Sequence, residues 1–211
     1  MKTTDLIAAL AADRTAVPAP GRALAHALLP GVAISMILYL WLVGWRDDIG
    51  SAASTTRFGL KVLLNAALVV TAIGLVLRLA CPGRRATSWM RALWSIPAVL
   101  LVAIAVELMV LPGTQWSAAA HGHNSMWCLT CIPALGLGPL LAGIWGLRAA
   151  APEKPAFAGA IMGLAAAGIS GTLYALHCTD DSPLFVAIWY SLAAAFLSLL
   201  GAVLGARMLR W

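Results

Sequence analysis

The feature that most constrains this chain is a series of six apolar runs, each long enough to cross a lipid bilayer as a helix. A spanning helix needs roughly 20 mainly apolar residues. Only 10% of the residues are charged, against about 25% in a soluble globular domain, so the composition fits lipid rather than water as solvent. The sequence therefore predicts an all-α integral membrane protein, a bundle of six transmembrane helices. The expected spans are Ala25–Trp45, Phe58–Ala80, Ala92–Leu111, Met126–Leu147, Phe157–Leu176 and Leu184–Arg207.

The distribution of positive charge predicts how these spans are oriented. Cytoplasmic loops carry an excess of Lys and Arg. If the N-terminus is cytoplasmic, all but three of the 14 Lys and Arg residues fall on that side, the exceptions being Arg46, Arg57 and Lys61. Both termini are therefore expected in the cytoplasm. The net charge of +6 is explained by this topology and by anionic lipid, so we expect the bilayer and no nucleic acid as a partner.

The residues before the first span predict a short amphipathic helix. Thr3 or Thr4 is placed to cap it, and Asp5 in the first turn is favourable against the helix dipole. Leu6, Ile7 and Leu10 form one apolar stripe, with Asp5 and Asp13 beside it; Pro18, Pro20 and Gly21 are expected to end the helix and tether it to the membrane.

About ten residues make a marginal helix alone, so the stripe is expected to become ordered by docking into a partner's groove. The alternative is a helix lying on the bilayer, which usually carries Lys or Arg along its polar face. The sequence thus predicts two parts, a cytoplasmic N-terminal segment over residues 1–22 and a six-helix transmembrane domain over residues 23–211.

A few residues within the spans are unusual for a lipid environment. Glu107 lies in the third predicted span, where an unpaired charge is expensive, so we expect it to face protein, water or an interface, or to be protonated. Gly159 and Gly163 on the fifth span, and Gly201 and Gly205 on the sixth, have the GxxxG spacing that allows helix backbones to approach closely.

The cysteines are separated by the predicted topology. Cys81 falls at the cytoplasmic end of the second span, whereas Cys128, Cys131 and Cys178 lie on the periplasmic side, close to His177 and to a His-Gly-His loop formed by residues 121–123. Neighbouring thiols in an oxidising compartment form labile disulfides, and thiolates with imidazole neighbours bind soft or borderline metals. Inert buried thiols are the third alternative. A membrane thiol-oxidising enzyme needs a second periplasmic pair, and one Cys remains there once the C-x-x-C is used.

Three segments resemble the NrsF family of bacterial membrane anti-sigma factors, and the similarity runs over essentially the entire chain. These segments are Thr3–Asp13, Cys128–Pro133, and the run Leu173–Phe185 followed by Trp189 and Tyr190. The resemblance implies a six-span protein of the bacterial inner membrane that is not an enzyme. It also implies that the cytoplasmic N-terminal segment holds an extracytoplasmic-function sigma factor inactive, and that periplasmic cysteines take part in the response to oxidative or heavy-metal stress.

Carried over by position, the resemblance implies two sets of site residues. The sigma-factor-binding residues are Asp5, Leu6, Ile7, Leu10 and Asp13, and the redox or metal-sensing residues are Cys128 and Cys178 with Cys131 and His177 beside them. Thr4 stands where a second acid is expected, and Cys131 is additional to the family pair. No cofactor is implied beyond a heavy metal bound transiently at the periplasmic cysteines. The competing hypothesis is a membrane thiol-disulfide oxidoreductase or a metal-handling protein that uses the same Cys and His residues.

Overall fold

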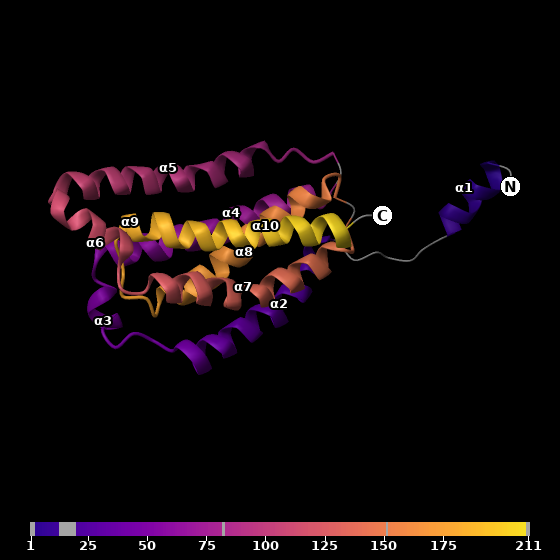
Figure 1. Ribbon diagram of the computed structural model, residues 1–211. Helices are drawn as coiled ribbons and strands as arrows, with labels where there is room; N and C mark the ends of the chain where they lie inside the picture. Colours follow the sequence, from indigo (N-terminus) through magenta and orange to yellow (C-terminus); the bar gives the residue numbers. More distant parts are fainter. Residues whose placement is uncertain (1–2, 13–19, 82, 151, 210–211) are drawn as a thin grey trace.

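The computed structural model describes residues 3–12, 20–81, 83–150 and 152–209, which form helices and loops with no β-strand among them. Six helical segments are long and apolar enough to cross a membrane, as the sequence predicts. Figure 1 shows them side by side, with α1 beyond one end of the bundle. The spanning elements are α2 (Pro20–Leu38) continued by η1 (Tyr39–Val43), α4 (Thr56–Leu79), α5 (Thr87–Val110), α7 (Ser125–Leu147), α8 (Pro155–Ala175), and the sequence α9 (Pro183–Phe185), η3 (Val186–Tyr190) and α10 (Ser191–Met208).

The bundle has two ends with different loops. The proximal end carries α1 (Thr3–Ala12), the loop over residues 80–86, the loop over 148–154 and the end of α10 (Figure 1). The distal end carries the longer loops over residues 44–55, 111–124 and 176–182. Short helices lie in two of these loops: α3 (Ile49–Ala52), and η2 (Gly113–Gln115) with α6 (Trp116–His121).

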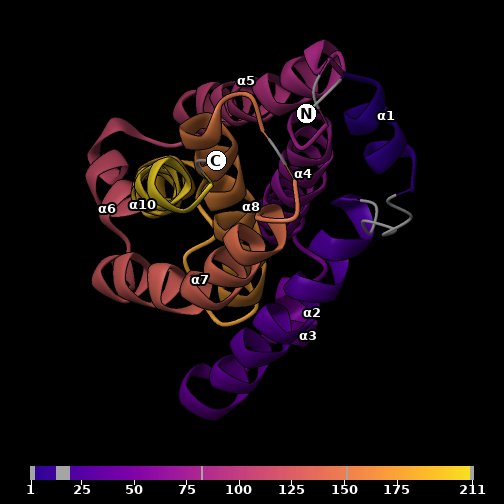
Figure 2. The ribbon, with the colours of Figure 1, turned by 90° about the vertical axis from the view of Figure 1, so that its right-hand side faces the viewer.

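Helix α8 is the centre of the bundle and α5 is at its edge. Helices α4, α7 and α10 all pack against α8, and Figure 2 shows them around it. In the most apolar stretch of α8, 67% of the residues are buried within the protein, whereas in α5 the share is 6%. Most of α5 is therefore left for lipid to cover, and α8 forms the core that positions the loops at both ends.

The predicted glycine motifs bring α8 and α10 into backbone contact. A methyl group on Gly159 would overlap the carbonyl oxygen of Gly201, and one on Gly201 would overlap that of Gly159. Gly163 lies in the same way against the carbonyl of Leu197. Because side chains are absent at these points, the two helices approach more closely than other residues would allow, and the prediction from the GxxxG spacing is confirmed.

Helices α2 and α7 approach closely at a proline. Pro139 has no N–H, so the carbonyl of Leu135 one turn earlier in α7 lacks its helical donor. The hydroxyl of Ser35 on α2 donates to that carbonyl at 2.6 Å. Gly31 and Gly138 face each other beside it, with no room for a side chain on either. A hydroxyl thus satisfies the backbone group that the proline leaves free within a helix long and apolar enough to span a membrane.

The ends of the elements differ from the prediction in ways that have local causes. The N-terminal helix is described over Thr3–Ala12, about the ten residues expected, and Pro18 lies outside the described residues; Pro20, expected in the tether, instead begins α2. Proline fits the first turn of a helix because an N–H there has no intrahelical acceptor. Likewise α5 begins at Thr87 rather than Ala92, because its first turn carries polar residues that a search for apolar runs excludes. The domain boundary at residue 22 remains a prediction.

Candidate functional site

The two cysteines expected to sense stress lie together at the distal end. Cys128 is in the first turn of α7, and Cys178 is in the loop that follows α8. Both side chains are fully buried, carry free thiols, belong to the same apolar cluster and are close enough to interact electrostatically. Cys131 is one turn further along α7 and half-buried, and Cys81 is at the proximal end. The predicted separation of Cys81 from the other three cysteines is therefore confirmed.

Two buried cations hold the main chain of Cys178. Lys61, on α4 and only 1% exposed, donates from Nζ to the carbonyl oxygen of Cys178 at 2.8 Å and to that of Asp180 at 3.3 Å, and forms an ion pair with Asp181. Arg46, which follows η1, donates to the same Cys178 carbonyl at 3.2 Å and to Asp181 at 3.0 Å. The loop carrying Cys178 is therefore attached to α4 and to the end of the first span by charge-assisted bonds.

A third contact joins the Cys178 loop to the loop that precedes Cys128. The carboxylate of Asp180 accepts hydrogen bonds from the backbone N–H groups of His123 and Asn124 at 3.0 and 2.8 Å, and from the Asn124 side chain at 3.1 Å. Gly122 allows the loop before Cys128 to come this close to Asp180 and Phe185. Its φ of +58° is one that side-chain-bearing residues rarely adopt, and an added methyl group would lie 2.5 Å from the Phe185 ring and 2.7 Å from the Asp180 carboxylate carbon.

The histidines of the predicted cluster do not converge on the thiols. His177 is half-buried, and its Nδ1 is 3.2 Å from the carbonyl oxygen of Gly44. The His123 side chain is 96% exposed, and Nδ1 of His121 is 2.9 Å from the carbonyl of Ser117. Among residues 3–12, 20–81, 83–150 and 152–209, no group of three or more His, Cys, Asp or Glu side chains is arranged to hold a metal ion.

The environment of Cys178 lowers the reactivity of its thiol. Burial raises the pKa of Cys178, and the neighbouring Lys61 ammonium offsets part of that increase. The thiol donates a weak hydrogen bond to the carbonyl of Asp180 at 3.8 Å. Since the thiolate is the nucleophile and the metal ligand, burial and the raised pKa both lower the reactivity of this thiol at neutral pH.

The charges around the thiols are paired with one another. Hydrogen bonds to the Asp48 carboxylate raise the pKa of Arg46, and the same bonds lower the pKa of Asp48. Nε of Arg46 is 2.6 Å from Oδ1 of Asp48. Arg46 entered the sequence analysis only through the predicted topology, and Lys61 through that topology and as a polar group near the start of the second span; neither was assigned a role at the thiols. One feature of the sequence could have pointed to Lys61: it lies within a predicted span, where an ionised side chain needs a partner.

Glu107 also belongs to the distal end, where it attaches α5 to the start of α9. Its carboxylate is buried, pairs with Arg57 at 3.2 Å, and accepts hydrogen bonds from the Ser182 hydroxyl at 2.8 Å and the Leu184 N–H at 3.1 Å. The carboxylate and the capping Ser182 hydroxyl thus share the Leu184 N–H at a helix N-terminus, a favourable position for negative charge. The expectation that Glu107 faces protein is confirmed.

The N-terminal helix is present as predicted, but only part of its stripe is described. Helix α1 covers Thr3–Ala12, and Asp5 and Ile7 are exposed on it. The side chains of Leu6 and Leu10, and the whole of Asp13, lie outside the described residues. Their assignment as partner-binding residues stays a prediction.

The family model and the two relatives found by comparison with known proteins all point to the same family. A family model named NrsF, described as "Negative regulator of sigma F", matches residues 10–211. The chain is 39% identical to the "Anti-sigma-F factor NrsF" of Caulobacter vibrioides (strain NA1000 / CB15N) and 34% identical to the "Probable anti-sigma-F factor NrsF" of Azospira oryzae (strain ATCC BAA-33 / DSM 13638 / PS). Both alignments cover 100% of each chain. No solved structure matches this chain.

Proposed function

The chain belongs to the NrsF family of negative regulators of sigma F, and from this premise we propose how it works as a membrane-bound anti-sigma factor. Its N-terminal helix sequesters an extracytoplasmic-function sigma factor. Oxidative or heavy-metal stress in the periplasm acts on Cys128 and Cys178 and releases that partner. The protein resides in the bacterial inner membrane, with its proximal end in the cytoplasm.

The observation that carries this proposal is the position of the two sets of residues. The buried thiols are at the distal end of the bundle, and α1 is beyond the proximal end (Figure 1). The positive-inside rule supports a cytoplasmic proximal end, because Arg78, Arg84, Arg85, Arg148 and Lys154 are all there. A periplasmic stimulus would then act on the distal end of the protein, and a cytoplasmic partner would bind at the proximal end.

Sequestration follows from the properties of α1. Ten residues form a marginal helix in isolation, so an apolar groove on the sigma factor would stabilise it on binding. Exposed Ile7 is one of the apolar anchors, and Asp5 adds an acidic contact beside it. The bound helix covers a surface that the sigma factor needs for polymerase.

Two chemical events at the distal end fit the pair of thiols. Oxidation would join Cys128 and Cys178 through an S–S bond, with loss of two protons and transfer of two electrons to the oxidant. A soft metal ion would instead bind both sulfur atoms after both protons leave. Either event changes the position or charge of Cys178, whose carbonyl Lys61 and Arg46 hold, and so disturbs the attachment of the loop to α4.

The size of the required change limits the mechanism. Converting a sigma factor from 99% bound to 99% free needs a change in affinity of about 10⁴-fold, or roughly 5.5 kcal/mol. One exposed helix of ten residues is too small to supply this difference alone. A rearrangement of the whole proximal end, or removal of the protein, would add the remainder.

Deletion of residues 1–17 from the full chain tests sequestration. We expect the shortened protein to insert in the membrane but to lose capture of its sigma factor, whereas an oxidoreductase or metal handler would keep its activity. Asp5→Asn with Ile7→Ala gives a milder form of the same test, and replacing exposed Ala12, at the last position of α1, by Gln serves as its control. Retention of sigma-factor capture by the deletion variant would refute the proposal.

Substitution of the thiols tests sensing. Cys128→Ser and Cys178→Ser should each abolish release under peroxide or heavy-metal stress while leaving capture intact. Cys81→Ser is the matched control, because this cysteine is at the other end of the bundle. Cys131→Ser separates a C-x-x-C bond from a bond between Cys128 and Cys178. If the two serine variants respond normally to stress, the cysteines are not the sensor.

A further inference from the structure

A cavity at the proximal end has positively charged side chains around it. It has a volume of about 460 Å³ and lies between the end of α4, the loop after it and the start of α8. Arg78, Arg84 and Lys154 line it, and none of the three has an ion pair within the described part of the chain. The acid beside them, Glu153, accepts a hydrogen bond from the Gly83 N–H at 3.1 Å. The cavity therefore has a net positive lining.

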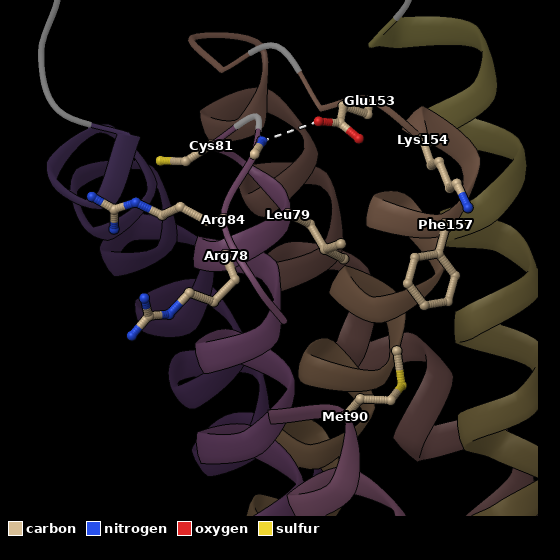
Figure 3. Close-up of a pocket in the computed structure, with 9 residues that line it drawn as sticks. Arg78, Leu79, Cys81, Arg84, Met90, Glu153, Lys154 and Phe157 are labelled. Carbon is tan, nitrogen blue, oxygen red and sulfur yellow. Dashed lines mark hydrogen bonds between the residues drawn. The ribbon is translucent and has the colours of Figure 1, made fainter. Parts of the chain in front are cut away.

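The charged side chains are at the rim and the apolar ones are deeper. Figure 3 shows Arg78 and Arg84 extending outward on one side and Lys154 on the other, with Met90 and Phe157 further along the bundle. All three cations are exposed. An anion would therefore be bound at the mouth of the cavity, where water and lipid headgroups meet, rather than in a closed pocket.

The cavity continues into a larger apolar groove. Met90 and Phe157 also line this second space, which has a volume of about 700 Å³ and runs between α5 on one side and α8 and α10 on the other. Its other walls include Trp94, Leu164 and Ala195. These residues lie within the spanning segments, so the groove is at the depth of the acyl chains. The weak packing of α5 against the bundle leaves it open.

We propose that this combined space binds one anionic phospholipid, such as phosphatidylglycerol. Arg78 and Arg84 on one side of the mouth and Lys154 on the other supply the positive charge that attracts the phosphate, and the acyl chains lie in the groove below Met90 and Phe157. Basic pockets between spanning helices at the cytoplasmic side suit anionic headgroups. An acidic protein surface would match the cations but would not fill an apolar groove at membrane depth. The site is independent of the proposed regulation of a sigma factor.

The test compares lipid binding by the full-length protein and its variants in detergent micelles, with native mass spectrometry as the readout. Dioleoyl-phosphatidylglycerol is the probe, and dioleoyl-phosphatidylcholine is the zwitterionic reference. Each Lys or Arg near an anionic surface contributes about a fivefold change in affinity, so Arg78→Gln, Arg84→Gln and Lys154→Gln together should weaken phosphatidylglycerol binding by roughly 100-fold. If the triple variant misfolds, Lys154→Gln alone should weaken it by about fivefold.

Two matched controls accompany these variants. Arg22→Gln, Arg148→Gln and Arg207→Gln together remove the same charge from exposed proximal positions outside the cavity, and should weaken binding at least tenfold less than the cavity variant. In the groove, Ala195→Trp should lower binding because it fills the space. Leu192→Trp, exposed on the same helix and outside the groove, should not.

Several outcomes would overturn the proposal. Equal losses in the cavity variant and its charge-matched control would mean that the attraction is only the general one between a basic protein and an anionic surface. Displacement of the lipid by inorganic phosphate or glycerophosphoglycerol at equal concentration would mean that only the anion is recognised. If the cavity variant keeps phosphatidylglycerol but loses its sigma factor, the cavity is instead a protein-docking site.

Discussion

The Lys61 ammonium is the group whose removal should most disturb the distal end. It is buried at 1% exposure inside α4 and contacts the carbonyls of Cys178 and Asp180 and the carboxylate of Asp181. Lys61→Met keeps most of the side-chain volume and removes the charge and the donors. Because little cavity is created, the effect should report mainly on the lost polar contacts.

The expected magnitude follows from these contacts. Removing one partner of a buried ion pair costs about 3–5 kcal/mol, since the other charge is left without compensation. Asp181 is partly buried and keeps Arg46 at 3.0 Å, so the value should be at the lower end. We therefore expect Lys61→Met to lower the free energy of unfolding by about 3 kcal/mol. If Cys178 becomes accessible by local opening, its alkylation should accelerate by roughly 100-fold.

Two measurements check this prediction. Reversible unfolding in mixed detergent micelles, followed by the fluorescence of the nine Trp residues, gives the change in stability. Maleimide labelling with mass-spectrometric localisation gives the rate at Cys178. Arg78→Met is the control, because it removes an exposed cation from the same helix. In a double-mutant cycle with Asp181→Asn, the coupling energy should be about 1–3 kcal/mol. A coupling energy near zero, or a Lys61→Met effect no larger than that of the control, would refute the reasoning.

Three further predictions concern the loop glycine, the helix contact and the pH dependence. Gly122→Ala should destabilise the protein by about 2–3 kcal/mol in thermal unfolding, because it combines positive-φ strain with overlap against a ring and a carboxylate, while Gly113→Ala in open space should have little effect. Gly201→Ala should cost about 1–3 kcal/mol by forcing α8 and α10 apart, and Gly59→Ala, which meets no neighbour, is its control. Burial raises the pKa of Cys178, so its thiol stays protonated when an unfolded thiol, with a pKa of about 8.5, ionises. The free energy of unfolding should therefore fall as the pH rises above about 8.5, and Cys178→Ser should remove that part of the decline.

The six spans were predictable because each depends on one local property, the length of an apolar run. The Gly159 and Gly201 contact was predictable for a similar reason, since the spacing itself marks the face that approaches another helix. The ends of the helices were harder to predict. A proline such as Pro20 can either follow one helix or begin the next, and the sequence alone does not distinguish the two; the structure shows that it begins α2.

The sequence predicted that the cysteines of the site lie at the same end of the bundle, but it did not predict the charged contacts around them. Topology alone brings Cys128 and Cys178 to the same end. The contact between Lys61 and the carbonyl of Cys178 joins residues 117 positions apart and depends on how α4 packs against α8. Similarly, Asp180 and Ser182 look like ordinary loop residues in sequence. Their partners, Asn124 and Glu107, lie in segments that no periodicity connects to them.

The backbone contact between α8 and α10 also has a mechanical consequence. Two helices whose glycines abut opposing carbonyls resist sliding and bending, so they behave as one stiff rod rather than as two independent ones. Helix α8, with 21 residues, is roughly 30 Å long. Pivoting such a rod by about 3° shifts its far tip by roughly 1.5 Å, given that length. We therefore expect a small pivot of this pair of helices at one end of the bundle to displace the other end by enough to reshape a contact there.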